Sequence, residues 1–119
     1  MKTKILVVDD EPNILMSLEF LLRKKGYEVF IARDGEEALN LFNSQEPNMA
    51  ILDIMMPKVD GYEVCNHIKA TLPSCKVIFL SAKTKEADIA KGYATGADLY
   101  MTKPFSTKKL LNNIEQLKI

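Results

Sequence analysis

Four short apolar runs of this sequence end in polar side chains that could do chemistry together. These side chains are Asp9, Asp10, Asp53, Ser81 and Lys103. Carboxylates that are packed together repel one another and are costly to remove from water, so the three aspartates would need a cation. Carboxylate oxygens are hard ligands of the kind that Mg²⁺ prefers, above all beside phosphate chemistry. These residue types therefore predict Mg²⁺-dependent chemistry on a phosphoryl group, provided that the fold brings them together.

The spacing of the apolar runs predicts the elements that would position these side chains. Runs rich in β-branched residues begin near residues 4, 27, 49, 76 and 98. The segments between them have the periodicity of amphipathic helices, and Asp34, Asp60 and Ser106 stand where N-caps would. The chain therefore reads strand then helix five times, and the units share no repeated side-chain pattern that would indicate a solenoid. Continuous apolar strands such as VIFL favour a parallel sheet that helices cover on both faces.

A parallel sheet would gather the polar strand ends at one edge. Residues just past the carboxyl ends of parallel strands meet there, and open α/β sheets bind their ligands at that edge. The alternative is that Asp9, Asp10 and Glu11 only complement the N-terminal dipole of the helix that follows them. Agreement among four strand ends favours a shared site over this alternative.

The length and composition limit the classes of protein to which the chain can belong. With 119 residues, 47% hydrophobic and 27% charged, residues 1–119 are predicted to form a single globular domain. The formal net charge of +0 gives no support for direct nucleic-acid binding, and the N-terminal apolar run is too short for a signal peptide or a membrane span. Cys65 and Cys75 form no metal or redox motif, so we expect a reducing, cytoplasmic location. The single histidine, His67, excludes a multi-histidine metal centre.

An ordered set of short motifs spans the chain from Lys4 to about Leu117. The motifs are Asp9-Asp10, Asp53, Pro57-x-x-Asp60-Gly61, Ser81-Ala82 and Lys103-Pro104-Phe105. On five correctly spaced strand ends, this set resembles the receiver domain of two-component response regulators. The resemblance implies a flavodoxin-like (βα)5 fold, a doubly wound five-stranded parallel sheet of order 2-1-3-4-5. It also implies that a histidine kinase or a histidine phosphotransfer protein phosphorylates one aspartate.

The resemblance implies a role for each matching side chain at the site. Asp53 would be the phosphoacceptor, and Lys103 would supply positive charge beside it. Asp10, Asp53 and the backbone carbonyl of Met55 would ligate Mg²⁺ directly, while Asp9 would act through a water. The ion would neutralise the charge that develops on the phosphoryl oxygens during transfer.

The resemblance also implies a conformational switch. Ser81 would hydrogen-bond a phosphoryl oxygen, and Tyr100 would turn inward when the Ser81 hydroxyl moves. Partner binding would then change on the face formed by the fourth helix, the fifth strand and the fifth helix. The alternative for Tyr100 is an ordinary half-exposed strand aromatic. A cis peptide bond between Lys103 and Pro104 is also expected from the family.

Two other classes of function compete with the receiver. One is a phosphatase that resembles the haloacid dehalogenase superfamily, which also uses an aspartyl nucleophile with Mg²⁺. Those enzymes carry a second Asp as acid and base two residues after the nucleophile, where this chain has Met55. The other is a binding module on the same fold, such as a flavin carrier or a degenerate receiver, which the full set Asp10, Asp53, Ser81 and Lys103 disfavours. The sequence leaves open the cognate kinase, the output partner, a phosphorylation-dependent dimer and whether an effector domain follows; no membrane partner is expected.

Overall fold

The protein is an alternation of strands and helices. The computed structural model describes residues 2–118, so the two ends of the predicted 1–119 domain lie outside the described residues. Within that range the strands are β1 (Lys4–Val8), β2 (Glu28–Ala32), β3 (Met49–Leu52), β4 (Lys76–Ser81) and β5 (Leu99–Thr102). The helices are α1 (Pro12–Lys24), α2 (Gly35–Gln45), α3 (Gly61–Thr71), α4 (Glu86–Ala94) and α5 (Thr107–Leu117). The predicted order of five strand–helix units is confirmed.

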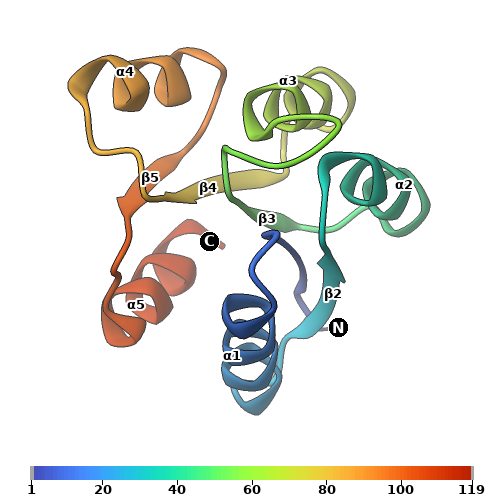
Figure 1. Ribbon diagram of the computed structural model, residues 1–119. Helices are drawn as coiled ribbons and strands as arrows, with labels where there is room; N and C mark the ends of the chain where they lie inside the picture. The colour runs from blue at the N-terminus through green and yellow to red at the C-terminus, as the bar shows by residue number, and fades with distance from the viewer. Residues whose placement is uncertain (1, 119) are drawn as a thin grey trace.

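All strand pairs of the sheet are parallel, and the strand order is β2-β1-β3-β4-β5 (Figure 1). The flavodoxin-like order that the resemblance implied is therefore confirmed. The chain leaves β1 toward one edge of the sheet and leaves β3 toward the other, so the winding direction reverses between these neighbouring strands. Such a point of reversal leaves a crevice at the carboxyl ends of the strands, where doubly wound sheets bind ligands.

Helices cover both faces of the sheet and bury two separate hydrophobic cores (Figure 1). On one face α1 and α5 pack, with Leu18, Leu22 and Ile114 against strand residues. On the other face α2, α3 and α4 pack, with Phe42 and Ile68 in the core. Strands covered on both faces explain why the runs are continuously apolar and do not alternate. No helix within residues 2–118 is long and apolar enough to cross a membrane.

Local capping signals set where several helices begin. The carboxylate of Asp34 accepts a hydrogen bond from the Glu37 N–H at 2.8 Å, and Asp60 and Ser106 cap α3 and α5 in the same way. These contacts satisfy backbone donors that the first helical turn leaves free. The N-cap predictions are confirmed. Gly26 follows α1 with φ +93°, a left-handed backbone that glycine adopts without strain.

Candidate functional site

Asp9 and Asp53 lie side by side because their strands are neighbours in register. Val8 pairs with Leu52, so the next residue on each strand extends past the sheet at the point where the winding reverses. The Asp53 N–H donates to the Val8 carbonyl at 2.9 Å and prolongs the ladder by one residue. Asp10 joins them: one carboxylate oxygen from each of the three aspartates lies within 4.8 Å of the others. The predicted convergence of these carboxylates is confirmed.

Backbone hydrogen bonds fix the two buried carboxylates. Asp9 is 2% exposed, and its Oδ1 accepts from the Glu11 N–H at 2.9 Å. Asp53 is 8% exposed, and its Oδ1 accepts from the Ile54 N–H at 2.8 Å. Asp10 is exposed at the mouth of the site. The second oxygen of Asp53, Oδ2, makes no hydrogen bond within residues 2–118 and has the Lys103 ammonium 3.6 Å away.

Lys103 brings the positive charge to this group. Its Nζ donates to Asp9 Oδ2 at 2.8 Å and lies 3.6 Å from Asp53 Oδ2. The exposed side chain of Glu11 forms a longer ion pair, with its Oε1 3.4 Å from Lys103 Nζ. The peptide bond between Lys103 and Pro104 is cis, as expected from the family, and the Lys103 N–H donates to the Ser81 carbonyl at 2.8 Å. Lys103 is therefore anchored at its backbone and paired at its ammonium group.

Burial and neighbouring negative charge both shape the electrostatics of the site. Burial is the main cause that raises the pKa of Asp53 to about 6, and the charge of Asp9 adds to the shift while Lys103 opposes it. Burial alone would lower the pKa of Lys103, but its hydrogen bond to Asp9 and the nearby carboxylate charges raise it. Lys103 is thus held in its charged form, and one ammonium does not balance three carboxylates.

A hard divalent cation fits this group of residues. The donor set consists of carboxylate oxygens close enough to share one ion. Burial is the main cause of the raised pKa of Asp53, and the charge of the neighbouring Asp9 adds to it. Asp10 and Met55 also line one hollow of about 610 Å³ beside these oxygens. Asp9 is already engaged by Lys103 and Glu11, which leaves Asp10 and Asp53 as the carboxylates free for direct ligation.

Ser81 and Tyr100 are connected through one residue. Ser81 ends β4 with its side chain buried, and its Oγ accepts from the Lys83 N–H at 3.1 Å. The Tyr100 hydroxyl donates to the Lys83 carbonyl at 2.8 Å. Tyr100 is 9% exposed, so the alternative of a half-exposed strand aromatic is wrong, and burial raises the pKa of its hydroxyl. The inward position of Tyr100 is the one that the structure contains.

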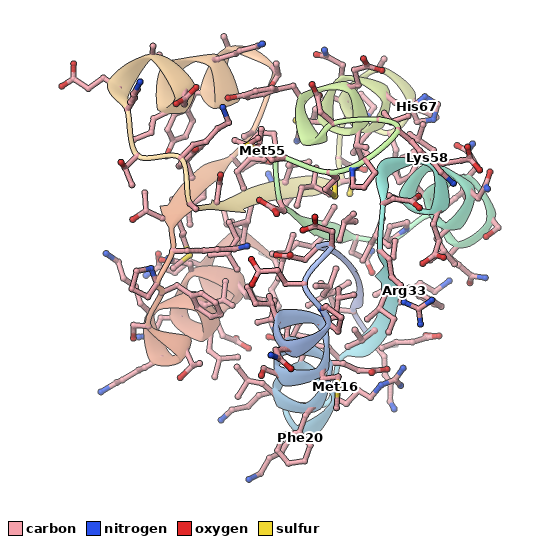
Figure 2. All side chains as sticks on the ribbon, in the orientation of Figure 1. Met16, Phe20, Arg33, Met55, Lys58 and His67 are labelled. Carbon is pink, nitrogen blue, oxygen red and sulfur yellow. The ribbon has the colours of Figure 1, made fainter. Side chains whose placement is uncertain are left out.

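The loop between β3 and α3 forms the wall of the site. Its residue Met55 is 66% exposed and lies at the mouth of the hollow, so it is pocket wall and not core (Figure 2). Gly61 closes the loop against the strand, because its N–H donates to the Ile54 carbonyl at 2.8 Å. A Cβ on Gly61 would lie 2.1 Å from the Asp53 carbonyl oxygen, which leaves room for no side chain.

Sequence reasoning missed several contacts of the site. The roles of the Glu11 backbone, the Lys83 carbonyl and Gly61 follow from three-dimensional proximity, and only the Pro-x-x-Asp-Gly motif gave a signal for the last. His67 lies on the outer side of α3, with Nε2 2.9 Å from Asn43 Oδ1 (Figure 2). It contacts no residue of the carboxylate cluster.

Comparisons with known proteins agree with this geometry. The family model of the response regulator receiver domain matches residues 5–115. The alkaline phosphatase synthesis transcriptional regulatory protein PhoP of Bacillus subtilis is 44% identical over 110 residues, covering 92% of this chain but 46% of that protein. The chain thus spans less than half the length of this relative.

Solved structures give the same result. The BeF3-activated receiver domain of DrrB, from Thermotoga maritima, is 37% identical with a TM-score of 0.92 over 98% of this chain and 97% of that chain. A CheY-like receiver domain protein from Methanospirillum hungatei JF-1 is 30% identical with a TM-score of 0.95 over 99% and 94%. Because the family model matches residues 5–115, nearly the whole length, this chain belongs to the family of response regulator receiver domains.

Proposed function

We propose that this receiver domain takes a phosphoryl group onto Asp53 from a histidine kinase or a histidine phosphotransfer protein in an Mg²⁺-dependent reaction. One observation carries the assignment: Asp53 is nearly buried at the point where the winding of the sheet reverses, within 4.8 Å of two other carboxylates and 3.6 Å from Lys103. An acceptor oxygen in this place has positive charge on one side and cation ligands on the other.

The transfer would proceed by in-line displacement. A carboxylate oxygen of Asp53 attacks phosphorus and forms the new P–O bond, while the P–N bond to the donor imidazole breaks and its electron pair leaves with nitrogen. Mg²⁺ held by Asp10, Asp53 and the Met55 carbonyl, with Asp9 acting through a water, would neutralise charge on the phosphoryl oxygens. Lys103 would stabilise the same oxygens from the other side, and the Ser81 hydroxyl would donate to one of them.

The chain would act as a switch that turns over no metabolite. A phosphatase that used Asp53 would need an acid and base two residues later, and Met55 cannot move a proton. The named relatives give the phosphatase alternative no support. The acyl phosphate should therefore persist long enough to signal. Its formation would draw Ser81 toward the phosphoryl group and alter the face built by α4, β5 and α5.

Partner and location follow from the same proposal. The α4-β5-α5 face would bind an output partner, an effector domain or a second phosphorylated copy, and this domain would contact neither nucleic acid nor membrane directly. Both cysteines are free thiols buried in the core, which suits the reducing cytoplasm where the kinase would meet its receiver. We treat the chain as one receiver domain over residues 1–119.

Labelling with a small phosphodonor tests the function directly. Acetyl phosphate with Mg²⁺ should add one phosphoryl group to the wild-type protein, as measured by intact-mass spectrometry. The added mass should be removed by neutral hydroxylamine, which cleaves acyl phosphates and leaves phosphoesters intact. Chelation of Mg²⁺ before the donor is added should prevent labelling. A protein that no phosphodonor labels, or one that carries a hydroxylamine-stable phosphate, would refute the proposal.

Magnesium should raise the thermal stability of the protein without any phosphodonor. The ion binds the folded carboxylate cluster and relieves its repulsion, so mass action shifts the folding equilibrium. Asp10→Ala should lose most of this rise, and its metal-free melting temperature should equal or exceed that of wild type. Glu86→Ala, which removes an exposed carboxylate that is not part of the cluster, serves as the control and should keep the full rise. A full response in Asp10→Ala would place the ion elsewhere.

Loss of the phosphoryl group should be slow. Met55 and Lys83 both line the hollow at the site, where a side chain could orient the attacking water. A thioether is a poor hydrogen-bond partner, and an ammonium group cannot accept a proton, so neither can act as a base. Met55→Asn combined with Lys83→Glu should accelerate the decay of the phosphoprotein after the donor is removed. Decay at an unchanged or lower rate would mean that these two side chains do not limit the reaction.

A further inference from the structure

Tyr100 is held at both ends by residues outside its own strand. β5 is at the edge of the sheet, where among residues 2–118 it pairs with β4 alone, and α4 packs against it (Figure 1). The Tyr100 N–H donates to the hydroxyl of Tyr93 on α4 at 3.1 Å. At the other end, the Tyr100 hydroxyl donates to the Lys83 carbonyl at 2.8 Å. The backbone N–H and the side-chain hydroxyl of Tyr100 are therefore both hydrogen-bonded to the segment formed by α4 and the loop before it.

The ring of Tyr100 fits into a space that Gly92 leaves open. It packs against Phe79 with ring centroids 6.0 Å apart, and the other side of the ring faces α4. A Cβ on Gly92 would lie 2.9 Å from Cδ2 of Tyr100 and 3.2 Å from Cδ2 of Phe79. Glycine is unfavourable within a helix compared with alanine. A side chain at this position would compete with the inward ring for the same space.

The residue that receives the Tyr100 hydroxyl also contacts Ser81. The Lys83 N–H donates to Ser81 Oγ at 3.1 Å, while the Lys83 carbonyl accepts from Tyr100. The inward ring and the Ser81 hydroxyl thus share one peptide segment. A change in either the position of Tyr100 or that of Ser81 alters a hydrogen bond of Lys83.

We propose that Gly92 and Tyr93 are positioning residues that hold Tyr100 inward and thereby set how readily the receiver adopts its phosphorylated conformation. The inference rests on the proposed function, in which Ser81 moves toward the phosphoryl group and Tyr100 turns inward. Gly92 supplies the space for the ring, and Tyr93 supplies the acceptor for the Tyr100 backbone. If only a fraction of the molecules has Tyr100 inward, the apparent affinity for a phosphoryl group or its analogue is the intrinsic affinity multiplied by that fraction.

Gly92→Ala tests the space. The protein is labelled with ¹³C in its tyrosine rings, and the Tyr100 resonance is assigned by its loss in Tyr100→Phe. In the metal-free Gly92→Ala variant, a soluble nitroxide should broaden this resonance more than in wild type, because the ring is exposed. Binding of beryllofluoride in the presence of Mg²⁺ should weaken by about three- to tenfold, the size of a modest population shift. Affinity for Mg²⁺ alone should stay unchanged, because the carboxylate cluster is not touched.

A double-mutant cycle shows whether the effect passes through Tyr100. In a Tyr100→Ala background the clash with the ring is gone, and Phe79, whose Cδ2 would lie 3.2 Å from the new Cβ, can move into the space that the ring leaves. Gly92→Ala should then leave beryllofluoride binding unchanged and should raise the melting temperature, as alanine favours the helix. An equal weakening in both backgrounds would overturn the inference. So would a ring that stays inward in Gly92→Ala, or one that moves outward without any change in beryllofluoride binding.

Tyr93→Phe tests the acceptor separately and keeps the proposal falsifiable if Gly92→Ala does not fold. It removes one hydroxyl, so the Tyr100 N–H should exchange faster with solvent and beryllofluoride should bind more weakly. Tyr27→Phe is the matched control, since it removes a hydroxyl bonded to Glu115 away from α4. Identical behaviour of Tyr93→Phe and the control would overturn the role of Tyr93. Failure of wild type to bind beryllofluoride would refute the proposed function, whereas the nitroxide and exchange measurements would still test the positions of the side chains.

Discussion

Asp53→Asn should take up no phosphoryl group from acetyl phosphate and Mg²⁺, under conditions that label the wild type completely. The amide is nearly isosteric with the carboxylate, but it has no anionic oxygen to attack phosphorus. Asp10 is exposed and Asp9 is occupied by Lys103, so neither should replace Asp53 as acceptor. Intact-mass spectrometry measures the result.

Asp34→Asn provides the matched control for this substitution. Asp34 caps α2, and asparagine caps a helix about as well as aspartate, so the fold should be unaffected. This variant should be labelled like the wild type. Undiminished labelling of Asp53→Asn would show that another side chain is the acceptor.

The same Asp53→Asn variant should be more stable than wild type when metal is absent. A folded-state pKa of about 6, above the ordinary 3.8, means that stability is highest below pH 3.8 and is lost as pH rises through 6. The ionised carboxylate then destabilises the folded state by about 3 kcal/mol, at about 1.4 kcal/mol per pKa unit. Asparagine cannot ionise, so the gain should be full above pH 7 and vanish near pH 4. Urea unfolding at several pH values measures this difference, and a gain independent of pH would contradict the assignment of the shift to Asp53.

Gly61→Ala should destabilise the protein more than any other single methyl addition discussed here. The new Cβ would lie 2.1 Å from the Asp53 carbonyl oxygen and 2.9 Å from the Ile54 Cα, and neither backbone atom can swing away as a side chain can. Moving that strand end breaks the Gly61–Ile54 hydrogen bond and displaces the phosphoacceptor. We expect a loss of more than about 4 kcal/mol of unfolding free energy. The residual folded protein should accept phosphate poorly.

Gly26→Ala separates this steric effect from the general effect of replacing glycine. A Cβ on Gly26 meets nothing within 4 Å, but the residue has φ +93° and alanine would be strained there. We expect a loss of about 1–2 kcal/mol with normal labelling by acetyl phosphate. Denaturant unfolding compares the two variants. Equal losses of unfolding free energy in the two variants would mean that the β3–α3 loop can shift to accommodate the new methyl group and does not fix the position of Asp53.

The positions of the carboxylates could be predicted from the sequence because each depends on local pattern and on one rule of topology. Apolar runs long enough for buried strands, N-caps such as Asp34 and Asp60, and a glycine after α1 are signals within a few residues of the elements they define. Parallel strands then bring their carboxyl ends to one edge of the sheet. The strand order that the resemblance implied adds that β1 and β3 are neighbours, which places Asp9 beside Asp53.

The pairing within the cluster was decided by the tertiary structure. Lys103 donates its hydrogen bond to Asp9 at 2.8 Å and stands farther from Asp53, at 3.6 Å. No sequence pattern encodes a difference of that size between two carboxylates. Burial of Asp53, which raises its pKa to about 6, likewise depends on how closely the loop after β3 folds over it.

The state of the switch residue shows the same division. The sequence by itself determined that Tyr100 lies on the fifth strand, three residues before Lys103, because strand position is read from a local apolar run. Its inward ring occupies space beside Gly92, its hydroxyl donates to the Lys83 carbonyl, and its backbone N–H donates to the Tyr93 hydroxyl. Such contacts arise between residues that are distant in the chain, where packing alone decides which rotamer fits. The sequence thus determined the fold and the chemistry at the strand ends, and the tertiary structure decided the pairing, the charge balance and the conformation of the switch.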